Sequence, residues 1–381
     1  MKQRILMIAD SDGQWTKRYI EHLLLPQGYE VVLFPIWGDQ GKFADFYRKA
    51  GVTVYEDRHR LPLVRRIPRL RMWVRIALNA ISLSKLGPFH IIHNHYLSQR
   101  DLALGQALCK RFPDAKWIAS FWGSDLLRGS PRHHSQMKPY LDKCNAITIH
   151  SSLQFDVMER YFGKVIREKT ALVYFGQTIY DDIDRMRKTV TQTDCKAHFG
   201  IDPAHTVVCV GYNASPAQHH PEILKALKKM PPEMLANLTV ILQMTYGNSD
   251  KAYSAAVQET AHSLPCETLV LTEFMDGTES AYLRLAADAF LLAIETDSFS
   301  ASLQEYLYAG TTAVTANWLS YPQLQELGIE IIPFDDYAQI PDLLCRALAV
   351  PLAPEQILRR SQLRNRYSWD AVRDGWLRLY R

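Results

Sequence analysis

The feature that most constrains the fold is a repeated alternation of short apolar runs with longer amphipathic segments. In the first half of the chain, apolar runs that end in polar residues lie at 4–10, 30–36, 52–57, 90–96, 116–123 and 146–152. Strands buried on both faces of a parallel sheet have this composition, and the spacers are long enough to hold helices. The pattern predicts a doubly wound α/β domain over residues 1–178.

The same alternation begins again after a polar segment. Apolar runs recur at 205–213, 238–247, 267–275, 287–296, 312–316 and 328–336. They predict a second doubly wound α/β domain over 200–362, which agrees with a length of 381 residues because single cores rarely exceed about 250–300 residues. We interpret the polar segment 177–194 as a linker and the segment 363–381, rich in Arg and aromatic residues, as a C-terminal helix.

Composition narrows the class of protein. The net charge of +4 is close to balance and does not indicate nucleic-acid binding. The six cysteines are scattered without a Cys-x-x-Cys pair, which predicts reduced thiols and a cytoplasmic protein. No run approaches the roughly 20 apolar residues of a membrane span, and the N-terminal run is too short for a signal peptide.

The stretch "DSFSASLQEYLYAG", residues 297–310, places two carboxylates at a strand-to-helix junction. Asp297 follows the apolar run 287–296, and Glu305 lies eight residues later on the expected helix. The carboxyl end of a parallel strand followed by a helix N-terminus is a common place to bind a phosphorylated ligand. The alternative interpretation is structural: Asp297 would cap the helix, and Glu305 would be a solvated helix acid.

Together, the two domains and the stretch 287–316 resemble the GT-B glycosyltransferases of the retaining family-4 kind, which act in bacterial surface polysaccharide synthesis. Their pattern is an acid, seven residues, Glu, and a helix ending in Ala-Gly; Asp297, Glu305 and Ala309-Gly310 occupy those places. The segments 90–96 and 120–127 resemble the strand ends of the first domain, and 367–380 resembles the closing helix, which in this fold crosses back to that domain. The resemblance implies two Rossmann-like domains that face an interdomain cleft.

This sequence departs from the family pattern in three places. Asp297 replaces the usual Glu, and Ser298-Phe299-Ser300 replaces Gly-Phe-Gly. The Arg and Lys that usually hold the donor diphosphate are missing, and "GYNASPAQHH" (211–220) stands there instead. That stretch is similar to bacterial lipid-linked-sugar transferases such as the 4-acetamido-4,6-dideoxygalactose transferase, a relation that leaves retention and inversion both open.

The resemblance assigns the nucleotide-sugar donor to the second domain. Amides near Ser300, Ala301 and Ser302 would receive the diphosphate, Glu305 the ribose hydroxyls, and Asp297 the sugar hydroxyls. The remaining donor-binding candidates follow the neighbouring strands: Gly211, Tyr212, Asn213, His219, His220, Gln243, Tyr246 and Phe274. Ordinary polar loops are the alternative for these. No Asp-x-Asp motif occurs in the expected setting, so we predict neither a cofactor nor an obligatory metal.

The first domain offers candidates for acid–base chemistry. The family has a His where this chain has Trp122, which leaves Asp125 and His95 as polar candidates, with Asp12 after the first strand. If the enzyme inverts, one of them would take the acceptor proton. If it retains, the departing phosphate serves as the base. A helix-capping Asp or a structural His is the alternative for each.

The segment 58–78 is the clearest charge anomaly. Seven arginines lie among Leu, Ile, Met72 and Trp73: Arg58, Arg60, Arg65, Arg66, Arg69, Arg71 and Arg75. Anionic lipid attracts such a segment, and its apolar residues can enter the headgroup layer. Because Pro62 and Pro68 interrupt its first part, an amphipathic helix is expected to begin near Arg69. We predict peripheral attachment to the inner face of the cell membrane; an Arg-rich solvated face is the alternative.

These observations predict a glycosyltransferase that moves a sugar from a nucleoside-diphosphate donor to a hydroxyl of a saccharide acceptor, expected to be lipid-linked. The predicted reaction is retaining, with an inverting transferase of the same fold as the alternative. A nucleotide-sugar 2-epimerase of the same fold is a further rival, which the arginines argue against. The non-enzymatic alternative is a degenerate transferase that supports another enzyme.

Overall fold

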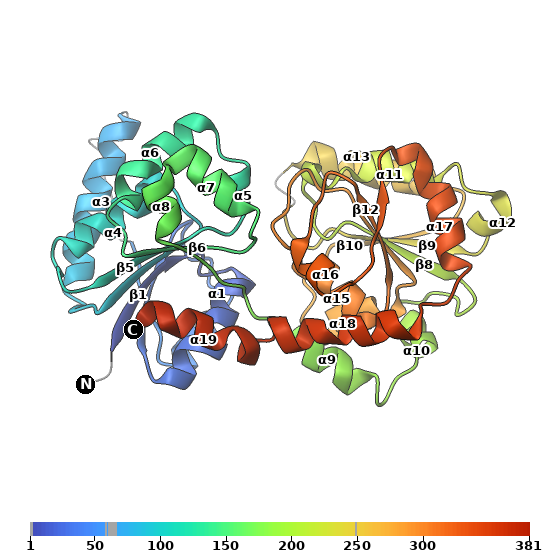
Figure 1. Cartoon of the computed structure of the whole chain (residues 1–381), viewed down its shortest axis with the longest axis horizontal. Helices are drawn as coiled ribbons and strands as arrows, with labels where there is room; N and C mark the ends of the chain where they lie inside the picture. Colours follow the sequence, from blue (N-terminus) through green and yellow to red (C-terminus); the bar gives the residue numbers. More distant parts are fainter. Residues whose placement is uncertain (1–2, 58, 60–66, 248–249) are drawn as a thin grey trace. The chain divides into compact units, whose positions relative to one another are not determined.

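The computed structural model describes residues 3–57, 59, 67–247 and 250–381, and the chain divides into two compact units (Figure 1). Unit 1 contains the chain up to Gly176 together with Trp369–Arg381, and unit 2 contains Gln177–Ser368. Each unit is built on one parallel sheet with helices on both faces, so the predicted pair of doubly wound α/β domains is confirmed.

The sheet of unit 1 has seven parallel strands in the order β3-β2-β1-β4-β5-β6-β7. Its strands are β1 (Arg4–Ala9), β2 (Glu30–Pro35), β3 (Thr53–Val54), β4 (Ile91–His95), β5 (Lys116–Ser120), β6 (Ala146–Ile149) and β7 (Thr170–Leu172). Six of them begin within the apolar runs that the sequence identifies. The short β7 lies in none of those runs.

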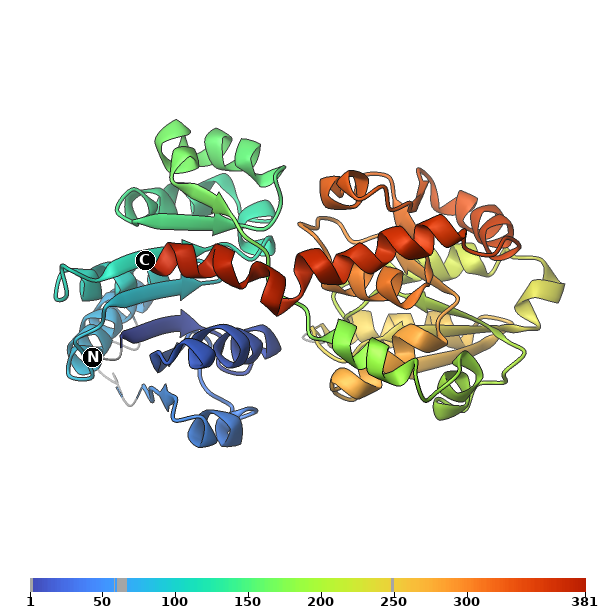
Figure 2. The same cartoon turned by 60° about the horizontal axis from the view of Figure 1, so that its bottom comes forward.

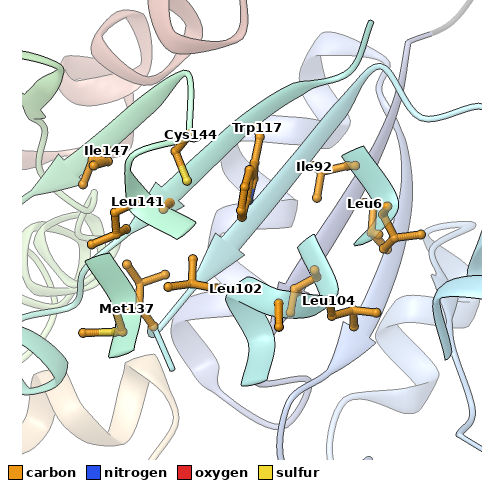
Figure 3. Close-up of a cluster of buried hydrophobic side chains, with 14 of the residues drawn as sticks. Leu6, Ile92, Leu102, Leu104, Trp117, Met137, Leu141, Cys144 and Ile147 are labelled. Carbon is orange, nitrogen blue, oxygen red and sulfur yellow. The ribbon is translucent and has the colours of Figure 1, made fainter. Parts of the chain in front are cut away.

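Side chains alternate along each strand and form a core on both faces of this sheet. Leu6 and Ile8 pack on one face, whereas Ile5 and Met7 pack on the other. Figure 3 shows the core on the face of Leu6 and Ile8, in which side chains from the helices meet Trp117 and Ile92 of the sheet. The helices are α1 (Gln14–Tyr19), α2 (Ala44–Lys49), α3 (Pro68–Ser84), α4 (Gln99–Cys109), α5 (Ser124–Leu127), α6 (Pro131–Leu141), α7 (Gln154–Phe162) and α8 (Lys164–Glu168), with a π-helical turn at Ile20–Leu24.

The C-terminal helix α19 (Trp369–Tyr380) belongs to unit 1, where it packs beside α1 on the face opposite α3 and α4 (Figures 1 and 2). Trp376 is fully buried and donates its indole N–H to the carbonyl of Tyr174 at 2.8 Å. The Tyr380 hydroxyl lies 2.7 Å from that of Tyr19 and 2.8 Å from Nδ1 of His93. These contacts make α19 an integral part of the core on the face of Ile5 and Met7.

The sheet of unit 2 has six parallel strands in the order β10-β9-β8-β11-β12-β13. They are β8 (Thr206–Val210), β9 (Leu238–Gln243), β10 (Glu267–Leu271), β11 (Ala289–Leu292), β12 (Thr312–Ala316) and β13 (Ile332–Phe334). The helices are α11 (His220–Leu227), α12 (Pro232–Leu235), α13 (Lys251–His262), α14 (Gly277–Ala286), α15 (Ala301–Ala309), α16 (Pro322–Glu326), α17 (Ile340–Leu348) and α18 (Pro354–Tyr367).

The segment interpreted as a linker is helical and belongs to unit 2. It forms α9 (Ile179–Met186) and α10 (Gln192–His198), and both helices pack against α14. Besides its charged residues, α9 has a buried apolar face formed by Ile179, Tyr180, Ile183 and Met186. This spacing places them on one side of a helix, so the interpretation as a linker is wrong.

The segment 363–381 is not one helix. The backbone is extended at Ser368 (φ −70°, ψ 159°), which ends α18 in unit 2 before α19 begins in unit 1. The prediction that the end of the chain returns to the first domain therefore agrees with α19 alone. By contrast, α3 begins at Pro68, one residue from the predicted start near Arg69. The residues Arg58, Arg60, Arg65 and Arg66 lie outside the described residues.

Candidate functional site

The candidate site in unit 2 forms where the strand order of the sheet reverses. β8 pairs with β9 on one side and with β11 on the other, so the chain adds strands on one side of β8 up to β10 and then on the other side from β11 onwards. The loops after β8, β9 and β11 therefore emerge side by side at the carboxyl edge. Ligands of open α/β sheets bind at such a switch point. The predicted donor residues on these loops share this edge.

Glu305 is fixed by a buried arginine. Nε and Nη2 of Arg284, on α14, both donate to Oε2 of Glu305, at 3.0 and 2.9 Å. Nη1 of Arg284 donates to Gln243 Oε1 and to the Tyr306 hydroxyl, each at 2.9 Å, and the guanidinium lies over the Tyr306 ring. Glu305 is 7% exposed and Arg284 2%. The alternative that Glu305 is a solvated helix acid is therefore wrong.

This network leaves Glu305 one usable oxygen. Oε1 has no hydrogen-bond partner among the residues that the structure describes, and it is not among the fully enclosed polar atoms. A carboxylate oxygen held in one orientation can accept hydrogen bonds from a ligand hydroxyl without first losing rotamer freedom. Arg284 thus positions the acid predicted to contact a donor ribose.

The N-terminus of α15 offers unused amides beside this acid. Ser300 caps the helix by accepting from the amide of Leu303 at 3.3 Å. Within the described part of the chain, the amides of Ala301 and Ser302 have no acceptor. N–H groups at the start of a helix favour the binding of anions, so these two amides are suited to bind a diphosphate.

Asp297 does not cap the helix, contrary to the alternative interpretation. Its Oδ1 accepts from the amide of Ser298 and its Oδ2 from the Tyr321 hydroxyl, each at 2.9 Å. Tyr321 is buried, and burial together with the nearby carboxylate raises its pKa well above the usual value. Asp297 therefore ties the loop before α15 to the segment after β12, and contact with a donor sugar stays a prediction.

Gly211 closes the end of β8 over two buried polar side chains. Its φ is +63°, and a Cβ there would lie 2.5 Å from Nε2 of His220 and 3.1 Å from Oε1 of Gln218. Neither those atoms nor Nε2 of Gln218 has a partner among the described residues. His220 is fully buried, and burial lowers its pKa to about 4. It is therefore neutral near pH 7 and can offer a phosphate only an N–H donor, and the contact with phosphate stays a prediction.

The other donor candidates lie nearer the surface. Nε2 of His219 lies 3.9 Å from Oε1 of Glu295, and its backbone is left-handed (φ 56°). Tyr246 is half-exposed, and its hydroxyl interacts with Asn213 and lies in the field of Glu305 and Asp297. The predicted candidates Tyr212, which follows Gly211, and Phe274, which is exposed after β10, complete this edge.

In unit 1, Asp125 organises the loops after β4 and β5. Oδ2 accepts from the amide of Leu97 at 2.7 Å, and Oδ1 accepts from those of Trp122 and Gly123 at 2.8 and 3.0 Å. Burial raises its pKa to about 6, although these hydrogen bonds act in the opposite direction. Three of the carboxylate's acceptor positions are thus occupied by backbone.

His95 lies within a buried aromatic cluster. Its Nδ1 accepts from the indole N–H of Trp122 at 3.2 Å, so the neutral ring carries its proton on Nε2. Burial, together with His93 and His150, lowers its pKa well below the usual value. His95 therefore has no lone pair available to take a proton. Asp12 is also engaged, because its oxygens accept from the amides of Gln40 and Lys42 at 2.7 and 2.8 Å.

Two functional candidates escaped the sequence analysis. Arg284 lies on the buried side of α14 in "ESAYLRLAADAF", and a cation among apolar helix residues was the signal for a buried pair. Gln218 follows Gly211 within the polar stretch 211–220 and carried no distinct signal. Asp297, Glu305, Gly211 and Gln243 are brought to one edge of unit 2.

Comparison with known proteins finds chains of similar structure at low sequence identity. No protein-family model and no curated protein matches the chain. A glycosyltransferase from Rickettsia africae is 12% identical with a TM-score of 0.76, covering 100% of this chain and 98% of the other. Sucrose-phosphate synthase from Thermosynechococcus elongatus is 14% identical with a TM-score of 0.72 and the same coverage. HepE from Anabaena, solved in complex with UDP-glucose, is 15% identical with a TM-score of 0.70 and 98% coverage of both chains.

The chain has the GT-B fold. In the parts of this GT-B chain that the structure describes, no group of three or more His, Cys, Asp or Glu side chains is placed to hold a metal ion. No described helix combines the length and apolarity needed to cross a bilayer.

Proposed function

We propose that this GT-B chain is a glycosyltransferase that uses a nucleoside-diphosphate sugar. The donor would bind at the carboxyl edge of unit 2. The observation that carries the proposal is the fixed Glu305 carboxylate, held by Arg284 within one helical turn or so of the unused amides of Ala301 and Ser302. The amides can donate hydrogen bonds to the oxygens of a diphosphate, and the carboxylate can accept hydrogen bonds from the hydroxyls of a ribose. HepE, a structural neighbour solved with UDP-glucose, lends support to this donor class.

The acceptor would be a saccharide bound by unit 1, and the reaction would be retaining. Support for retention comes from the engaged side chains of unit 1. Nδ1 of His95 already accepts from Trp122, each oxygen of Asp12 accepts from one backbone amide, and the Asp125 carboxylate accepts from three. A retaining reaction in which the departing phosphate takes the proton needs no protein base. Inversion with Asp125 as the base is the alternative, because a pKa of about 6 suits that role.

Attachment to an anionic membrane surface would bring a lipid-linked acceptor to the enzyme. Support comes from the outer face of α3, on which Leu70, Trp73 and Ile81 are exposed at helical spacing. Arg69 and Arg71 lie beside this apolar row. An exposed apolar stripe bordered by arginines suits the headgroup layer of an anionic bilayer.

The test of donor binding is a calorimetric titration with UDP, UDP-glucose and the other nucleoside diphosphates. Glu305→Gln keeps an acceptor for Arg284, so it tests the carboxylate with less damage to the fold than Glu305→Ala. Its matched control is Glu259→Gln, an exposed acid on α13. We expect one nucleotide to bind wild type and Glu259→Gln equally, and Glu305→Gln about tenfold or more weakly. Equal binding by all three proteins, or none at millimolar nucleotide, would refute the donor site.

Turnover separates the enzyme from a degenerate partner protein. The protein is incubated with the bound nucleotide sugar and membrane extract, and release of the nucleoside diphosphate is followed with the anomeric configuration of the product. Retention with activity left in Asp125→Asn supports the proposed reaction. Inversion with loss of activity in Asp125→Asn would replace it, and donor binding without release would establish the partner protein.

Membrane attachment is tested by sedimentation with vesicles of neutral lipid and of neutral lipid mixed with anionic lipid. We expect binding to the mixed vesicles that falls with salt and is lost in Leu70→Ser/Trp73→Ser. Exposed Val165, on α8 of the same unit, provides the control variant Val165→Ser. Equal binding to both kinds of vesicle, or equal binding by the α3 variant, would refute the role of α3.

A further inference from the structure

Three aromatic side chains form a row across the carboxyl edge of the sheet of unit 1. Trp37 follows β2, Tyr96 follows β4 and Trp122 follows β5. The ring centroids of Trp37 and Tyr96 are 5.0 Å apart, and those of Tyr96 and Trp122 are 6.1 Å apart. Because the strand order of this sheet reverses between β1 and β4, the row crosses its switch point, where ligands of open α/β sheets bind.

The row is exposed to solvent although its members are large aromatic side chains. Trp37 is 61% exposed, and Tyr96 and Trp122 are partly exposed. Tyr96 also has a left-handed backbone (φ 58°), which is uncommon for an aromatic residue and costs free energy. Packing of the core does not explain an exposed indole, and strained residues of this kind cluster at functional sites.

Asp125 fixes two of the loops that carry the row. Its carboxylate accepts from the amide of Leu97, which follows Tyr96, at 2.7 Å and from the amide of Trp122 at 2.8 Å. The hydroxyl of Tyr96 accepts from that of Ser124 at 3.3 Å. The rings of Tyr96 and Trp122 are therefore held before a ligand arrives, which lowers the cost of ordering them on binding.

Asp12 fixes the loop of Trp37 in the same way. Its Oδ2 accepts from the amide of Gln40 at 2.7 Å and its Oδ1 from that of Lys42 at 2.8 Å, which ties this loop to the end of β1. Asp12 and Asp125, both candidates for the base, thus each hold a pair of loops together through backbone amides.

Hydrogen-bonding groups of both kinds lie beside Trp37. Together with Asp39 and Arg100, Trp37 lines a cavity of about 740 Å³. Oδ1 of Asp39 accepts from the amide of Gly41 at 2.7 Å, and its Oδ2 has no partner in the part of the chain that the structure describes. Nε and Nη2 of Arg100 are bonded, whereas its Nη1 has no acceptor among the described residues. A free acceptor and a free donor suit hydroxyl groups, which can both donate and accept.

The charges at this cavity are mixed and do not favour an anion. Its lining contains four acids and three arginines: Asp39, Glu56, Asp57, Asp101, Arg71, Arg75 and Arg100. Two of the arginines are paired with two of the acids. A phosphate would meet repulsion as well as attraction here, so a neutral ligand fits better. A sugar is neutral and combines hydroxyls with C–H groups on the faces of its ring, which pack on aromatic rings.

We propose that Trp37, Tyr96 and Trp122 form a platform on which a neutral oligosaccharide stacks its rings, and that Asp12 and Asp125 are positioning residues that hold this platform rather than bases. Each step along the row is comparable with the width of one pyranose, so the ligand has at least two sugar rings. The assignment of this ligand as the acceptor rests on the proposed transferase function, whereas its binding does not.

The test is a calorimetric titration of the full chain, without nucleotide, with the neutral disaccharides cellobiose, lactose and N,N′-diacetylchitobiose. Glucose has a single ring, sorbitol has hydroxyls without a ring, and uridine has a base. We expect at least one disaccharide to bind about tenfold or more tightly than these three. Equal binding of sorbitol would refute stacking, and equal binding of glucose the second ring. Tighter binding of uridine, or no disaccharide binding at high millimolar concentration, would overturn the platform.

Variants of Trp37 locate the binding. Trp37→Ala should weaken the bound disaccharide about tenfold or more, whereas Trp37→Tyr keeps an aromatic face and should retain most of the affinity. The control is Tyr161→Ala, which removes an exposed aromatic side chain from α7 of the same unit. Because Trp37 is exposed, its removal should leave the Tm unchanged. Wild-type affinity in Trp37→Ala contradicts the proposal.

A double-mutant cycle tests whether Asp12 acts through Trp37. Asp12→Asn should weaken the disaccharide in the wild-type background and have little further effect in Trp37→Ala, because the loop then has no ring to position. A purely structural role for Asp12 predicts the same loss in both backgrounds, and that result would remove it from the proposal.

Asp125→Asn distinguishes a positioning residue from a base. Loss of a base lowers kcat and leaves the binding of a disaccharide unchanged. Loss of a contact that holds the platform weakens this binding even without donor, and we expect a change of about fivefold or more that disappears in the Tyr96→Ala background. Unchanged binding in Asp125→Asn would reject its positioning role.

Glu305→Gln keeps this inference separable from the donor site. The variant should bind the disaccharide as wild type does, because Glu305 belongs to unit 2. If wild type binds a disaccharide but no nucleotide, the platform stands and the transferase function falls. If wild type binds a nucleotide that Glu305→Gln loses, but no disaccharide, the donor site stands and the platform falls.

Discussion

The ion pair between Arg284 and Glu305 makes the sharpest prediction about stability. Replacing Glu305 with Ala leaves a guanidinium that is 2% exposed without its carboxylate. Removing one partner of a buried pair costs about 3–5 kcal/mol, because the other charge stays buried and uncompensated. Gln243 and the Tyr306 hydroxyl still accept from Nη1 of Arg284. We therefore expect a loss near the lower end, about 3 kcal/mol of the free energy of unfolding of unit 2.

A double-mutant cycle separates the pair from the packing around it. Arg284→Met should cost a similar amount, because it leaves the Glu305 carboxylate buried. In Arg284→Met/Glu305→Leu neither charge remains, so the double variant should be destabilised by clearly less than the sum of the single changes. We expect a coupling of at least about 2 kcal/mol, at the upper end of values for residues in contact.

Urea unfolding of the full chain measures these changes, with the two units fitted as separate transitions. Amide hydrogen exchange then assigns the weakened unit: the peptides of α14 and α15 should exchange faster in each single variant, and those of β4 should not. If Glu305→Ala costs less than about 1 kcal/mol, or if the single changes add within about 0.5 kcal/mol, the pair does not fix the acid as we argue.

Three further changes test other parts of the structure. Gly211→Ala should destabilise unit 2 by at least about 1–2 kcal/mol in urea, because φ is +63° and the new Cβ would lie 2.5 Å from Nε2 of His220. Trp376→Ala should cost about 3–5 kcal/mol in unit 1, measured in the same way, since the indole is fully buried and bonded to the Tyr174 carbonyl. Burial lowers the pKa of His93 to about 3 and that of His150 to about 4, so both contribute stability above pH 6.5 that is lost as the pH falls towards those values. The urea midpoint of unit 1 should therefore drop between pH 7.5 and 5.5, by less in His93→Gln, while Asp125, with its pKa raised to about 6, opposes the drop below that pH.

Much of the fold could be predicted because buried parallel strands leave a local record. The run 206–210 is apolar on both faces of β8, and the polar residues after it mark the carboxyl edge where the loop begins. The same holds for β11 and the stretch after it. Since all strands of a sheet are parallel, the ends of these runs predict which loops share an edge.

What could not be predicted depends on contacts far apart in sequence. Arg284 and Glu305 are 21 residues apart, and no local pattern says that their helices face each other. His220 reads as a polar residue at a helix start, yet Gly211 covers it. The helix α9 reads as a linker because half of its residues are charged, although Ile179, Ile183 and Met186 belong to one buried face.

The buried polar groups Arg284, Glu305 and Gln218 of unit 2 are not explained by a gain in the free energy of unfolding. A buried ion pair is weak evidence for stability, since apolar residues of the same volume often do as well. A buried amide without a partner, such as Gln218, costs free energy. Yet both features lie at the carboxyl edge of β8, β9 and β11, where the strand order reverses. Sequences break local rules of folding mainly at functional sites. These costs at one edge support the proposal that the fixed Glu305 and the close approach over Gly211 serve a ligand rather than the core.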